Sequence, residues 1–106
     1  MGPKTSDLRD RLRQTSALLN RADESHWAAW MDKSLHRIEN SDLSGIDHLL
    51  GAYGGMGSFN DLVLIAANGH SVSDADYRSV NDRLDSLRSE MYELACAIRR
   101  NAEITD

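Results

Sequence analysis

The chain has 106 residues, 41% of them hydrophobic and 27% charged, which is the size of one domain with a modest core. Its formal charge of -5 disfavours binding to nucleic acid or anionic lipid, because both need a cationic surface. The one cysteine, Cys96, excludes an internal disulfide framework, the charged N-terminal region argues against a signal peptide, and no apolar run is long enough to span a membrane. We therefore expect a cytoplasmic protein with no nucleic-acid or membrane partner.

The N-terminal region predicts one amphipathic helix. Pro3 is the only proline, so no later residue carries the strongest helix breaker. An acidic turn follows Ser6, and leucines then recur at helical spacing as far as Asn20. We expect a helix here, preceded by disorder over residues 1–5.

Two further helices are predicted before the middle of the chain. Asp23 is a suitable N-cap for a helix with one apolar stripe that ends at Asn40. Ser41 or Asp42 can cap a third, shorter helix, which the pair Gly54-Gly55 would stop.

The next segment is open to two interpretations. Ser58 and Asp61 have the spacing of a capping box, which predicts a fourth helix from Phe59 to Ala67. The apolar run Leu62–Ile65 could equally be a buried strand, but the chain offers no second strand to pair with it.

The C-terminal segment predicts a long helix. Its apolar residues recur in alternating steps of three and four: Tyr77, Val80, Leu84, Leu87, Met91, Leu94 and Ile98. Residues 94–98 are apolar on all sides, so neighbouring helices or a second copy of the chain should enclose them. We expect an all-α single domain over residues 1–106, with four to five helices and this one as the spine.

A cluster of glycines lies between the third and fourth predicted helices. The loop residues are Gly54, Gly55, Gly57 and Ser58. A phosphate site would need cations, and there is no Lys or Arg between Ile38 and Tyr77, so we interpret the loop as a helix–helix connection that needs positive φ angles. Met56 and Phe59 are either core residues or an exposed apolar knob, with core the favoured interpretation, and Met56 is also counted among the candidate partner-binding residues.

The same gap in basic residues concentrates the net charge. Residues 41–76 contain five acidic residues and no Lys or Arg. The candidate acidic surface consists of Glu39, Asp42, Asp47, Asp61, Asp74 and Asp76. Such a surface would steer association with a basic partner, but helix capping alone explains most of these positions equally well.

No catalytic or metal constellation is complete in the sequence. The four histidines lack the paired Cys/His spacing of a zinc site, and Ser58, Asp61 and His70 have the residue types of a triad without a nucleophile elbow. We expect no metal, no cofactor and no enzymatic activity.

One stretch has a distinctive pattern. The segment LLGAYGGMGSFNDLVL over residues 49–64, followed by Asn68-Gly69 and by Leu84-x-x-Leu87, resembles a family of small bacterial domains of unknown function that share a GGMGS-x-ND-L core. The resemblance implies no activity. In size and charge the chain is also similar to immunity proteins, which bind and neutralise a toxin made by the same cell.

We therefore expect one function and keep one alternative to it. The first is a non-enzymatic binding protein, most concretely an immunity protein whose acidic surface masks a basic toxin, for example a nuclease. The second is a homodimeric structural or adaptor protein that pairs through one face of the last helix, at Tyr77, Leu84, Met91 and Ile98.

Overall fold

The computed structural model describes residues 1–102 and confirms the all-α prediction. It contains four α-helices, with no strand among the described residues. They are α1 (Pro3–Arg21), α2 (Ser25–Glu39), α3 (Ser44–Leu50) and α4 (Tyr77–Ala102), with the 3-10 turns η1 (Phe59–Asp61) and η2 (Ala66–Asn68) between α3 and α4. None of the helices in this range is long and apolar enough to cross a membrane.

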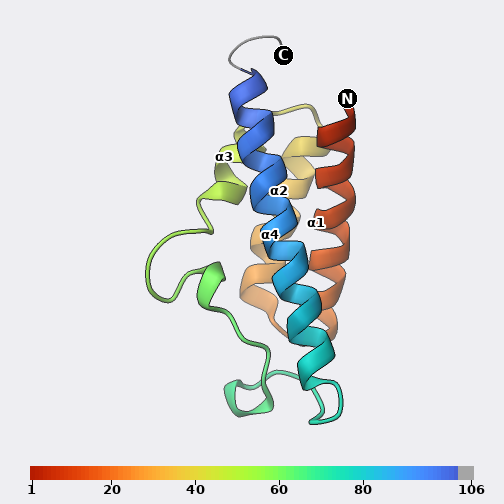
Figure 1. The fold of residues 1–106 in the computed structure, drawn as a ribbon, viewed down its shortest axis with the longest axis vertical. Coiled ribbons are helices and arrows are strands. Elements are labelled where there is room, and N and C mark those ends of the chain that lie inside the picture. Colours follow the sequence, from red (N-terminus) through yellow and green to blue (C-terminus); the bar gives the residue numbers. More distant parts are fainter. Residues whose placement is uncertain (103–106) are drawn as a thin grey trace.

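Three helices form the body of the molecule. α1 runs antiparallel to α2 and α4, and the bundle measures 46 × 25 × 20 Å (Figure 1). Its centre is filled by fully buried side chains from all three helices: Leu8, Leu12, Leu19, Met31, Leu84 and Met91. Each such side chain contributes about 1.5–3 kcal/mol through removal of apolar surface from water.

The first helix begins earlier than predicted. α1 starts at Pro3, so residues 3–5, for which we expected disorder, form its first turn. Proline suits this position because its ring fixes φ and the missing N–H has no helical partner there. The amide of Ser6 donates to the carbonyl of Gly2 at 2.9 Å and closes the turn.

The second and third helices are close to their predicted ranges, with different ends. The N-cap of α2 is Glu24 and not Asp23, and its carboxylate accepts from the amide of Trp27 at 2.9 Å. α3 ends at Leu50 and packs closely on α2, because a Cβ on Gly45 would lie 2.9 Å from the Cβ of Arg37. The glycine therefore sets the distance between these two helices.

His48 joins α3 to α2 on one side of this contact. Its ring stacks on Trp30 with centroids 4.5 Å apart, and its Nδ1 lies 2.7 Å from the hydroxyl of the buried Ser34. Burial, followed by the positive charge of Arg37, lowers the pKa of His48.

The predicted fourth helix is wrong. Residues 59–61 make a single 3-10 turn, the following residues are extended, and η2 is a second short turn that ends at Gly69 with φ of +88°. The strand interpretation fails as well, because no strand is present in residues 1–102. Residues 51–76, here called the connection, instead descend along one side of α4 from the end near α3 to the opposite end (Figure 1).

Candidate protein-binding site

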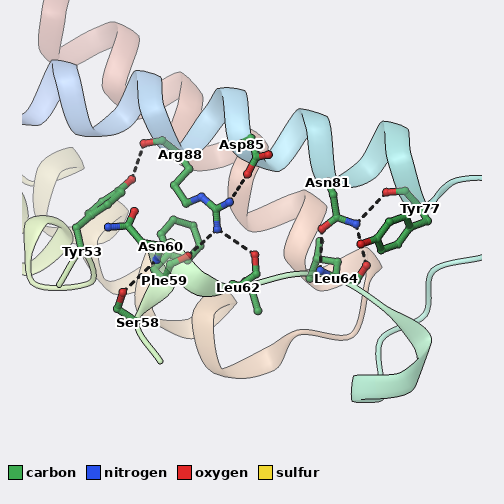
Figure 2. A network of polar contacts seen from close by, with 10 residues as sticks. All are labelled: Tyr53, Ser58, Phe59, Asn60, Leu62, Leu64, Tyr77, Asn81, Asp85 and Arg88. Carbon is green, nitrogen blue, oxygen red and sulfur yellow. Dashed lines mark hydrogen bonds and ion pairs between the residues drawn. The ribbon is translucent and has the colours of Figure 1, made fainter. Parts of the chain in front are cut away.

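Asn81 of α4 fixes the extended part of the connection. The amide of Leu64 donates to Asn81 Oδ1 at 2.8 Å, and Asn81 Nδ2 donates to the carbonyl of Leu64 at 2.9 Å and to that of Tyr77 at 2.8 Å (Figure 2). A primary amide thus supplies the donor and acceptor that a neighbouring strand would present. Leu64 is fully buried, so both of its backbone groups need these partners.

Arg88, about two turns further along α4, fixes the same segment. Its Nη1 donates to the carbonyls of Phe59 at 2.7 Å and Leu62 at 3.0 Å, while Nη2 donates to the carboxylate of Asp85 (Figure 2). The guanidinium carbon stands 5.7 Å from the ring centroid of Phe59. The Arg88 side chain is only 12% exposed, against 64% for Asp85, so the cation faces inward and its carboxylate partner faces solvent.

Tyr53 completes the attachment at the start of the connection. Its hydroxyl donates to the backbone carbonyl of Arg88 at 2.8 Å (Figure 2), and its ring packs edge-on against Phe59 and 5.1 Å from that of Tyr92. Burial raises the pKa of Tyr53 above its usual value, so this hydroxyl remains a donor.

The glycine loop lies between these attachments and projects from the bundle between α3 and η1 (Figure 1). Gly55 and Gly57 have φ of +75° and +78°, as expected for a connection that needs positive φ angles. The carboxylate of Asp61 accepts from the amide of Gly57 at 2.8 Å. Phe59 is fully buried, whereas Met56 is 100% exposed, so the core interpretation is right for Phe59 and wrong for Met56.

A cleft of about 490 Å³ opens between the connection and α4. We call it the tyrosine cleft; its lining residues are Tyr53, Asn60, Asp85, Arg88, Ser89, Tyr92 and Glu93. Its volume lies within the range of roughly 300–1,000 Å³ that is typical of ligand pockets. Half-exposed Tyr92 and exposed Glu93 bring an aromatic ring and a carboxylate to the same opening.

His70 anchors the far end of the connection. Its Nδ1 accepts from the amide of Ile65 at 3.1 Å, so the proton of the neutral ring is on Nε2, which lies 3.2 Å from Glu24. Ser71 adds a backbone bond to the carbonyl of Ala22 at 2.9 Å. His70 is therefore bonded to the N-terminus of α2 and not to Ser58 or Asp61, and no group of three metal-ligating side chains occurs within residues 1–102.

The predicted acidic surface does not form a compact patch. The segments that carry the carboxylates lie at both ends and in the middle of the long axis (Figure 1). Three members have local partners: Asp42 accepts from the amide of Ser44, Asp61 from that of Gly57 and Asp76 from the hydroxyl of Ser73. Two others form ion pairs between helices, Glu39 with Arg13 and Asp47 with Arg99. Asp74 is exposed. Local hydrogen bonds and separate ion pairs thus account for most of these positions better than convergence on one patch does.

The predicted dimer face is also corrected. Leu84, Met91 and Ile98 are at most 2% exposed, because the bundle encloses them, and only Tyr77 is substantially exposed. The apolar end over residues 94–98 is buried or half-buried within the same chain. This stripe is core, so it does not present a surface to a second copy.

The sequence reasoning missed the residues that build this site: Tyr53, Asn81, Arg88, Tyr92 and Glu93. One feature of the sequence could have indicated that such residues exist. Four consecutive apolar residues, 62–65, had no pairing partner, so their backbone groups required side chains from elsewhere.

The protein is a small helical bundle with a long connection, which side chains of α4 hold in place by hydrogen bonds. A family model matches residues 20–73, just over half of the chain, and its description is a domain of unknown function, DUF6966. The chain belongs to this family. No curated protein and no solved structure matches it.

Proposed function

We propose that this chain is a non-enzymatic protein-binding module whose contact surface is the glycine loop together with the tyrosine cleft. In its most concrete form it is an immunity protein that binds and masks a basic bacterial toxin in the cytoplasm. This proposal does not require the carboxylates predicted from the sequence to form one compact patch.

The observation that carries the proposal is the complete exposure of Met56 on a loop held at both ends. Tyr53 holds the loop on one side, and Arg88 and Asn81 hold it on the other. A fully exposed methionine gives up the free energy that burial would provide, about 1.5–3 kcal/mol, and a partner surface can recover it. Methionine also adapts to irregular apolar surfaces.

A basic partner is supported by charge. The formal charge is -5, and the segment that forms the loop and one wall of the cleft contains no Lys or Arg. Carboxylates spread along the connection accelerate the approach of a cationic partner without forming one compact patch.

The test is calorimetric titration of the purified chain with the product of the gene adjacent to its own, which we expect to be a basic protein. We expect binding by the wild type and a Kd at least about tenfold higher for Met56→Asp, since the lost apolar burial corresponds to that factor or more. The matched control is Leu43→Asp, which introduces the same charge at another exposed apolar residue, 49% exposed on the α2–α3 side. Absence of binding, or an equal loss in both variants, contradicts the proposal.

A further inference from the structure

The tyrosine cleft has an uneven charge distribution. Of its lining residues only Arg88 is cationic, and its two terminal nitrogens already donate to Phe59, Leu62 and Asp85. The carboxylate of Asp85 is exposed, and exposed Glu93 makes no ion pair within residues 1–102. The cleft therefore presents net negative charge to solvent.

The wall that the connection contributes does not offset this charge. Tyr53 and Asn60, the two residues that the connection contributes to the cleft, are uncharged, and residues 41–76 contain no Lys or Arg. Asp61, next to Asn60, adds a further exposed carboxylate. Charge complementarity at this opening thus favours a cation.

The tyrosine rings at the cleft indicate which kind of cation it would bind. Tyr92 is 46% exposed and lies at the opening, with its ring 5.1 Å from that of Tyr53. Beneath them, the Arg88 guanidinium already combines an aromatic ring, carbonyl oxygens and a carboxylate. Planar guanidinium groups stack on aromatic rings and donate in their plane to oxygen acceptors, which a compact, strongly hydrated ammonium does less well.

We propose that the tyrosine cleft binds the guanidinium group of an arginine side chain of the partner protein. The ring of Tyr92 packs against the guanidinium plane, and the carboxylate of Glu93 and the side-chain oxygen of Asn60 accept its hydrogen bonds. The inference rests on the proposed function, because it assigns the cleft to the same partner that Met56 contacts.

The test uses single amino acid amides and needs no partner protein. N-acetylarginine amide is titrated into the isotopically labelled full chain while the ring resonances of Tyr92 and the amide of Glu93 are followed by NMR. We expect saturable shifts at these residues with a Kd of about 1–100 mM, a range usual for so small a ligand. N-acetylcitrulline amide, which has nearly the same shape without the charge, should bind at least fivefold more weakly. Equal binding of citrulline amide, tighter binding of N-acetyllysine amide, or shifts confined to other surfaces would overturn the assignment.

A pair of variants separates the cleft from general electrostatics. Glu93→Gln should weaken binding of the arginine amide at least threefold. Asp82→Asn removes the same charge from an exposed position of the same helix outside the cleft, and should leave the Kd within about 1.5-fold. An equal loss in both variants contradicts a defined site. Because this titration contains no partner protein, the arginine amide can fail to bind while the Met56 test supports the proposed function. Equally, the arginine amide can bind while the Met56 test contradicts the proposed function.

Discussion

Asn81 and Arg88 take the place that a neighbouring strand would have in a sheet. Between them they pair the backbone of Leu64 in both directions and the carbonyls of Phe59 and Leu62. This explains how an extended, buried segment exists in a protein with no strand in its described residues. Two side chains on one helix thus supply the hydrogen bonds that a second strand would otherwise supply.

The substitution Asn81→Ala tests this role. It leaves the buried N–H and C=O of Leu64 without partners, so we expect the free energy of unfolding to fall by about 2–4 kcal/mol, measured by urea denaturation. Ser86→Ala, at an exposed position of the same helix, controls for the higher helix propensity of alanine. Equal stability of the two variants would show that the pairing is dispensable.

At the level of single residues, the sequence could not separate Met56 from Phe59. Both are large apolar residues beside the same glycine loop, yet one is fully exposed and the other fully buried. Phe59 makes ring contacts with Tyr53 and with Trp27, which is distant in the sequence, whereas Met56 is fully exposed. Composition and spacing contain no information about such contacts.

At the level of elements, the long helices were predictable and the segment after Ser58 was not. The alternating steps of three and four in α4 reflect one continuous buried face, which is a property of the local sequence. The capping box at Ser58 concerns only a few residues, and here it caps a single 3-10 turn. Tertiary hydrogen bonds from α4 then outweigh the local helix signal over residues 62–65.

Two glycines of the same loop provide a matched test of its conformation. Gly57 has φ of +78°, whereas the φ of Gly54 is not positive, and both have open space at the Cβ position. Gly57→Ala should lower the free energy of unfolding by about 1–2 kcal/mol, because side chains destabilise the left-handed region. Gly54→Ala should leave it unchanged or raise it by up to about 1 kcal/mol through a less flexible unfolded chain. Thermal denaturation of both variants measures this difference in stability. If Gly54→Ala were the less stable variant, Gly57 would not need its positive φ.

At the level of the whole molecule, periodicity alone could not show what covers the apolar stripe of α4. An intramolecular bundle and a homodimer both require apolar residues at these spacings. The structure places Leu84, Met91 and Ile98 in the core formed with α1 and α2. The distribution of charge was ambiguous in the same way. Carboxylates that are close together in the sequence are separated in the fold, where they act as caps or form individual ion pairs.

Met91→Ala distinguishes a core residue from an interface residue. Since Met91 is fully buried, we expect a loss of about 2–5 kcal/mol in the free energy of unfolding, measured by chemical denaturation. The solution mass from light scattering should stay the same in wild type and variant across protein concentrations. A mass that falls on substitution, with stability unchanged, would restore the dimer interpretation.

The hydrogen bonds by which α4 holds the connection affect how this chain is compared with its relatives. The match to the family model ends at residue 73, while Asn81 and Arg88 lie beyond it. The recognisable portion of the chain is therefore smaller than the unit that can fold, because an excised fragment would lack the groups that satisfy its own backbone. Relatives that keep the glycine loop must either retain an equivalent of this last helix or have found another means of holding the loop in place.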